Sequence, residues 1–116
     1  MKKVFQTKFG EYGNCLEACI ASLFEINIDE VPSLRMGTWQ NDLNEWLIKK
    51  YGLWSITITA GKPIPITDSN IIAIGMSERG LKHAVIYCQG KLLHDPHPSN
   101  TGILEVDEFD LILKYF

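Results

Sequence analysis

The sequence predicts an α+β domain in which N-terminal helices pack on an antiparallel β-sheet. Apolar residues recur at helical spacing in the first half of the chain and at alternate positions in much of the second half. Gln89-Gly90 is a two-residue turn signal between two of the later apolar segments. Helices followed by strands, rather than strands alternating with helices, are typical of the α+β class. A chain of 116 residues favours one domain with one core, so we expect residues 1–116 to form a single domain.

Two amphipathic helices are predicted in the first half. Asn14 is placed to cap the first one, because its side-chain oxygen can accept hydrogen bonds from the unpaired amides of a first turn. This helix is expected to end near Glu25, and its apolar face contains Leu16, Cys19, Ile20, Leu23 and Phe24. The second helix is expected over residues 39–52, where Gly52 is suited to end it. Residues 27–34 between them are expected to form a short helical turn and a loop.

The period of the apolar residues changes after Gly52, and strands are predicted from there on. Residues 54–59 alternate as in a half-buried strand, and the continuous apolar run 70–76 is typical of a central strand. Residues 82–88 and 91–95 are expected to form a hairpin. A loop is expected over residues 61–68, which contain two prolines.

The end of the chain is expected to return to helix. Residues 103–106 are assigned a short strand, and Asp107 is placed to cap a final helix. The apolar residues of that helix would be Phe109, Ile112, Leu113 and Phe116.

Composition narrows the function classes and the compartment. The net charge is −3 and no basic block is present, so nothing favours a nucleic-acid partner. No apolar run approaches the roughly 20 residues that a membrane-spanning helix needs. Met1-Lys2-Lys3 is followed by too few apolar residues for a secretion signal, and the three cysteines are an odd number without a disulfide framework. We therefore expect a cytoplasmic protein with reduced thiols.

Cys15 is the candidate nucleophile, because it stands at the head of the first predicted helix. The positive end of the helix dipole and the unpaired amides of the first turn favour a thiolate over a thiol. The same amides can hold the oxyanion that forms when a thiolate attacks a carbonyl group. Taken alone, Cys15 would be interpreted as a small buried apolar residue, as we interpret Cys19 and Cys88.

His83 and Asp95 are predicted to supply a base and the group that orients it. A hairpin turn at Gln89-Gly90 pairs residue i with residue 179 − i, so His83 would lie opposite position 96, beside Asp95. A carboxylate there would fix the tautomer of the imidazole and stabilise its protonated form. Nucleophile, base and orienting group are then all present.

These segments resemble the papain-like cysteine peptidases. More narrowly, the chain is similar to bacteriocin-processing peptidase domains at the front of some ABC exporters, and to small bacterial and phage proteins. The matching pieces are Gln6, Asn14-Cys15-Leu16-Glu17-Ala18-Cys19-Ile20-Ala21-Ser22, His83-Ala84-Val85 and Asp95-Pro96, and the phage-type relatives share Gly-Asn-Cys-Leu-x-Ala-Cys and His-Asp-Pro-His-Pro-Ser.

The resemblance implies a papain-like fold and a peptidase-like activity on a peptide or protein amide, without a cofactor or metal. Cys15 would be the nucleophile, His83 the base and Asp95 the orienting group. Gln6 would be the side-chain donor of the oxyanion hole, although it lies nine positions before Cys15, a longer gap than the family usually has. Asn14 is the alternative donor.

Two other functions stay open. A papain-like module without activity could bind a peptide or a protein partner, and the short chain leaves little material for substrate subsites. The cluster His94-Asp95-Pro96-His97 could also suggest a metal site, since imidazole and carboxylate groups suit zinc. His94 and Asp95 should point to opposite faces of a strand, so such a site would need His83 and His97 to converge with Asp95. His97 is otherwise interpreted as a solvated loop residue, with a place beside the substrate as the alternative.

Overall fold

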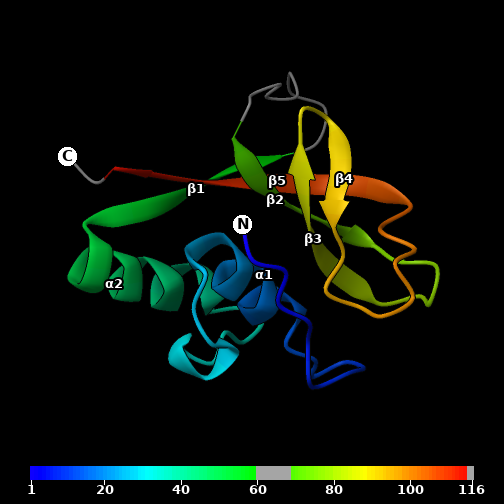
Figure 1. Cartoon of the computed structure of the whole chain (residues 1–116), viewed down its shortest axis with the longest axis horizontal. Coiled ribbons are helices and arrows are strands. Elements are labelled where there is room, and N and C mark those ends of the chain that lie inside the picture. Colours follow the sequence, from blue (N-terminus) through cyan, green and yellow to red (C-terminus); the bar gives the residue numbers. More distant parts are fainter. Residues whose placement is uncertain (60–68, 115–116) are drawn as a thin grey trace.

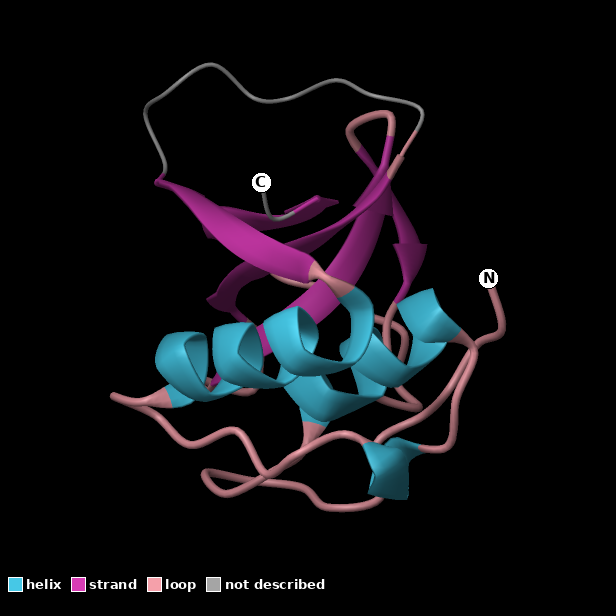
Figure 2. Ribbon diagram, turned by 90° about the vertical axis from the view of Figure 1, so that its left-hand side faces the viewer, coloured by secondary structure: helices cyan, strands magenta, loops and turns pink. Residues whose placement is uncertain are grey.

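The computed structural model describes residues 1–59 and 69–114, and it is an α+β structure with two α-helices packed on a five-stranded antiparallel sheet (Figure 1). The strand order is β1-β5-β2-β3-β4. The helices gather on one side of the sheet (Figure 2). The elements are α1 (Cys15–Phe24), a 3₁₀ turn η1 (Ile28–Glu30), α2 (Trp39–Tyr51), β1 (Leu53–Thr59), β2 (Asn70–Met76), β3 (Lys82–Cys88), β4 (Lys91–His94) and β5 (Glu105–Lys114).

Helix α1 begins at Cys15 as predicted, but the predicted cap by Asn14 is wrong. The Asn14 side chain makes no hydrogen bond to the helix. Its Oδ1 instead accepts hydrogen bonds from the amides of Thr7 and Lys8, each at 2.9 Å, and its Nδ2 donates to Thr7 Oγ1. The entry segment folds back beside the helix, and its amides take the oxygen that would otherwise cap. The first-turn amides of α1 therefore receive no cap from Asn14.

The core lies between the helices and the sheet. Helix α2 ends at Tyr51, and Gly52 follows it as the predicted helix end, in the left-handed conformation with φ of 65°. Apolar side chains that are fully buried on the helix-facing side of the sheet include Ile20, Leu43, Leu47, Ile72 and Ile86. A smaller cluster contains Ile71, Ala73, Val85 and Phe109. Two layers that bury one face of each helix against a sheet are the usual way for such elements to exclude water.

Strand β5 corrects the prediction for the end of the chain. Residues 105–114 are one strand that pairs with β1 on one side and β2 on the other, and no helix begins at Asp107. Phe109 and Asp110 are both buried, and since successive side chains of a strand point to opposite faces, both faces of β5 are covered at this point. The apolar spacing suited a helix, but pairing along two strands outweighed that local preference. Phe116 and residues 61–68 lie outside the described residues.

The β3–β4 hairpin follows the predicted register only at its turn. Cys88 pairs with Lys91 and Tyr87 with Leu92, but the register then shifts by one residue, so that Ile86 pairs with His94. The predicted position of His83 opposite residue 96 is therefore wrong. Strand β4 ends at His94, and Asp95 begins the loop that follows. The shift is a bulge, which bends the strand and redirects the residues beyond it.

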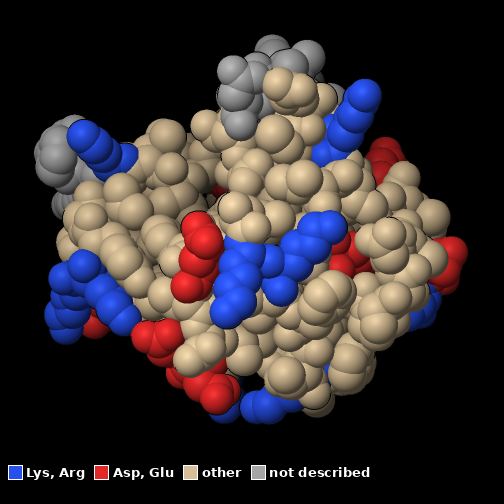
Figure 3. Space-filling view, viewed as in Figure 1, with Lys and Arg blue, Asp and Glu red and all other residues tan. Residues whose placement is uncertain are grey.

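The surface does not have one dominant sign of charge on the face that Figure 3 shows, where Lys and Arg lie among Asp, Glu and uncharged residues. Within the described part of the chain, we find no helix with the length and apolar character needed to cross a bilayer.

Candidate active site

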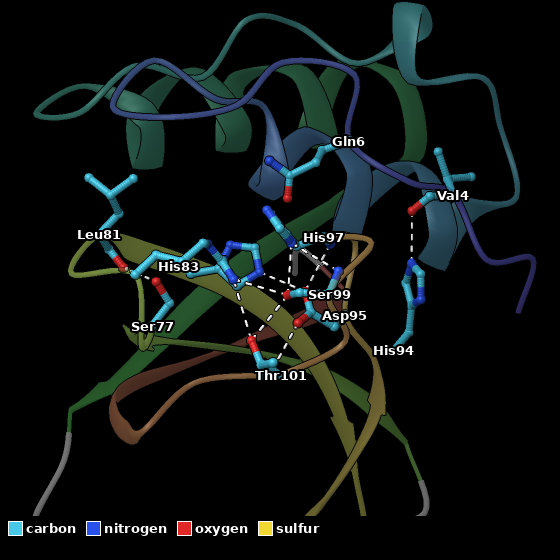
Figure 4. A network of polar contacts seen from close by, with 12 residues as sticks. Val4, Gln6, Ser77, Leu81, His83, His94, Asp95, His97, Ser99 and Thr101 are labelled. Carbon is cyan, nitrogen blue, oxygen red and sulfur yellow. Dashed lines mark hydrogen bonds and ion pairs between the residues drawn. The ribbon is translucent and has the colours of Figure 1, made fainter.

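A cavity of about 290 Å³ brings three of the four predicted site residues together. Cys15 at the head of α1, His83 at the start of β3 and Gln6 from the entry segment all line it. The cavity lies where the helical layer meets the sheet. Figure 4 shows three of its lining residues, Gln6, His83 and His97, together with neighbouring polar contacts. The site thus joins residues that are far apart in the sequence.

Asp95, the fourth predicted residue, lies behind His83 and is bonded to it. The distance between His83 Nε2 and Asp95 Oδ1 is 2.6 Å, and both side chains are buried (Figure 4). Asp95 also accepts hydrogen bonds from two backbone amides, those of His97 at 2.9 Å and Gly102 at 2.8 Å. Burial acts to raise the pKa of Asp95, but these hydrogen bonds outweigh it and lower the pKa. Asp95 is thus a fixed carboxylate.

His83 is held in its protonated form at neutral pH. Burial acts to lower its pKa, but the hydrogen bond to Asp95 and the interaction with the Cys15 side chain raise the pKa to about 9. Since Asp95 occupies Nε2, the other ring nitrogen, Nδ1, is the one left for the thiol and the substrate. The interaction with Cys15 places the His83 ring beside the candidate nucleophile.

Donors for an oxyanion are present at the same place. The first amides of α1 have no acceptor within the helix, as at the start of any helix, and the Asn14 side chain does not cap them. The Gln6 side chain lies in the cavity wall, where its Nε2 donates one hydrogen bond to Lys8 O at 2.9 Å. The backbone N–H of Gln6 also donates to Pro96 O at 3.1 Å, which connects Gln6 to the loop that begins at Asp95. Asn14, the alternative donor, has its side chain bonded to Thr7 and Lys8.

The other two histidines have separate places. His94 is buried and its Nε2 donates to Val4 O at 2.8 Å, on the far side from the cavity (Figure 4). His97 is half-buried in the cavity wall, with its ring edge-on to that of His83 at a centroid distance of 6.1 Å. Among residues 1–59 and 69–114, no three His, Cys, Asp or Glu side chains are grouped so that they could hold a metal ion.

Other lining residues were not predicted from the sequence. Arg79 comes from the turn between β2 and β3, and Glu108 from β5. The position of Arg79 four residues before His83 was a usable signal, because a residue in the connection before a strand lies at the same edge of the sheet. Glu108 had no such signal, because its segment was predicted to be a helix. Cys19 is fully buried, as expected for a core residue.

Comparisons with protein-family models, with curated proteins and with solved structures find no match for this chain. The geometry of the site is therefore the basis for its proposed chemistry.

Proposed function

We propose that this protein is a papain-like cysteine hydrolase, or a related acyltransferase, that acts on a peptide-like amide. The observation that carries the proposal is the buried His83 ring, bonded to Asp95 at 2.6 Å and sharing a cavity with Cys15. A nucleophile, a base and an orienting carboxylate are the groups that thiol-dependent acyl transfer needs. Their chain order, with the cysteine on a helix and the histidine and aspartate on the sheet side, is that of papain-like peptidases.

The chemistry begins with the Cys15 thiolate, which attacks the carbonyl carbon and forms a C–S bond. The first-turn amides of α1 and Gln6 Nε2 hold the oxygen that becomes negative. The C–N bond then breaks as His83 passes its proton to the leaving nitrogen, so that an amine departs and a thioester remains on Cys15.

The second half returns the site to its starting state. Neutral His83 takes a proton from water, and the resulting hydroxide attacks the thioester. The carboxylic acid leaves, the Cys15 thiolate is restored, and His83 again carries the proton. An amine in place of water gives a new amide by the same steps.

Peptide cleavage followed by mass spectrometry tests this proposal. The protein is incubated with a mixed peptide library, and cleavage products and acyl adducts on Cys15 are measured for wild type, Cys15→Ala and Cys88→Ala. We expect new peptide termini with wild type and Cys88→Ala and none with Cys15→Ala. Cleavage that survives Cys15→Ala would contradict the proposal. Peptide binding without any Cys15-dependent product would favour the inactive binding module instead.

A further inference from the structure

Arg79 is a positioned cation in the wall of the cavity. Its Nη1 donates to two hydroxyl groups, Ser99 Oγ at 3.1 Å and Thr101 Oγ1 at 3.4 Å. Both hydroxyls belong to the loop that wraps Asp95, whose carboxylate accepts from Gly102 N at the end of the same loop. Among the described residues, no carboxylate forms an ion pair with Arg79. The guanidinium is therefore held in place by neutral groups, and its other N–H donors are available to a ligand.

His97 lies in the same wall with one ring nitrogen already used. Its Nδ1 accepts a hydrogen bond from Ser99 N at 3.0 Å and contacts Ser99 Oγ at 2.8 Å. Burial and the charge of Arg79 lower the pKa of His97, which favours the neutral form of the ring. A neutral imidazole that accepts at Nδ1 carries its proton on Nε2. His97 is thus a hydrogen-bond donor beside Arg79.

The place of these two groups relative to His83 decides which part of a substrate they meet. His83 must reach the leaving nitrogen to protonate it, so the leaving group lies against the His83 side of the cavity. His97 contacts the His83 ring edge-on, and Ser99 links His97 to Arg79. The acyl part stays bonded to Cys15, with its oxygen at the head of α1. Arg79 and His97 therefore face the leaving group.

We propose that Arg79, with the Nε2–H of His97, binds a carboxylate on the leaving-group side of the scissile amide. This inference rests on the proposed function and narrows its substrate class to peptides with a negative charge just after the cleaved bond. The carboxylate is either the C-terminal one or that of an acidic side chain. Arginine suits it because the planar guanidinium binds both oxygens of a carboxylate at once.

Two alkylating reagents that differ in one charge test the proposal. Rates of Cys15 alkylation by iodoacetate and by iodoacetamide are measured by peptide mapping for wild type, Arg79→Gln, Arg79→Lys and Lys82→Gln. Both reagents consume the same thiolate, so their rate ratio reports the local field and not the activation of Cys15. Lys82→Gln is the matched control, because Lys82 also lines the cavity and is exposed.

We expect Arg79→Gln to lower the iodoacetate-to-iodoacetamide ratio by about three- to fivefold, the size of one nearby unit charge in a solvated site. Arg79→Lys should keep most of the ratio, and Lys82→Gln should change it by much less than Arg79→Gln. An unchanged ratio in Arg79→Gln, or an equal fall in Lys82→Gln, overturns the proposal. A failure of the proposed function would give a different result: wild-type Cys15 would react with iodoacetamide only as an ordinary thiol does.

Protection of Cys15 from iodoacetamide identifies the source of the carboxylate. The protectants are an acetylated alanine tripeptide with a free C-terminus, the same peptide as its amide, and an amide with one internal aspartate. Better protection by the first assigns the C-terminal carboxylate, and better protection by the third assigns an acidic side chain. Equal effects of all three peptides contradict the proposal.

Discussion

Asp110 is a carboxyl group buried in the middle of the sheet, and replacing it with asparagine should stabilise the protein above neutral pH. Its Oδ1 accepts from Thr57 Oγ1 at 2.5 Å, and its side chain is 1% exposed. Asp110 Oδ2 and Glu108 Oε2 are buried, and neither has a hydrogen-bond partner among the described residues. Burial and the nearby charge of Glu108 raise the pKa of Asp110 to about 7, although the hydrogen bond from Thr57 acts to lower it. A proton on Asp110 Oδ2 could be donated to Glu108 Oε2, which would give both oxygens a partner.

The magnitude follows from this shift. A pKa of 3.8 in the unfolded chain and about 7 in the folded protein corresponds to on the order of 4 kcal/mol. Because the folded pKa is the higher one, this stability is fully present below pH 3.8 and is lost as the pH rises to 7. Asparagine mimics the protonated acid: its Oδ1 can accept from Thr57 and its Nδ2 can donate to Glu108.

Urea unfolding near pH 4 and at pH 8.5 measures the effect. We expect Asp110→Asn to match wild type at the lower pH and to be more stable by about 2–4 kcal/mol at the higher one. For a domain of this size, each kcal/mol of stability corresponds to a shift of about 4 °C in Tm. Asp107→Asn, an exposed change on the same strand, is the control and should have little effect at either pH. A difference between Asp110→Asn and wild type that does not depend on pH would refute the reasoning.

Two further predictions concern the site and the sheet. Asp95→Asn should lower the pKa of His83 from about 9 to near or below 6.5, because burial lowers this pKa and only Cys15 would then oppose it. NMR titration of the ring protons measures the pKa, and an unchanged value would contradict the prediction. Gly75→Ala should lower the free energy of unfolding by about 3 kcal/mol or more, because a Cβ there would lie 1.9 Å from the backbone oxygen of Glu105. Gly52→Ala, with open space around it and φ of 65°, should lose only about 1 kcal/mol, and equal losses in the two variants would argue against a close approach at Gly75.

Local sequence patterns predicted most of the elements. The two helices had a clear period and a defined end, such as Gly52 after α2, and the central strand had a continuous apolar run. Strand β5 was predicted wrongly, because the spacing of its apolar residues suited a helix while its structure depends on pairing with β1 and β2. A segment that is decided by distant partners cannot be assigned from its own residues.

The residues of the candidate site were likewise predicted only where a local pattern indicated them. The hairpin turn brought Asp95 near His83, and the two are bonded, although the bulge at Ile86 changed the register that predicted it. Asn14 was misassigned because its partners, Thr7 and Lys8, lie in an irregular segment with no pattern. Hydrogen bonds within such loops depend on the folded path of the chain and leave no periodic signal.

The most direct test of the central claim is the rate at which iodoacetamide alkylates Cys15 as a function of pH, in wild type and in His83→Ala. Peptide mapping follows Cys15 separately from Cys88, which lies half-buried at the end of β3 and serves as the internal reference. If the His83 imidazolium holds Cys15 as a thiolate, Cys15 in wild type should react fully well below pH 8. In His83→Ala, the reaction should rise only near pH ~8.5, as for an ordinary thiol. A wild-type profile like that of an ordinary thiol, unchanged in His83→Ala, would contradict the account.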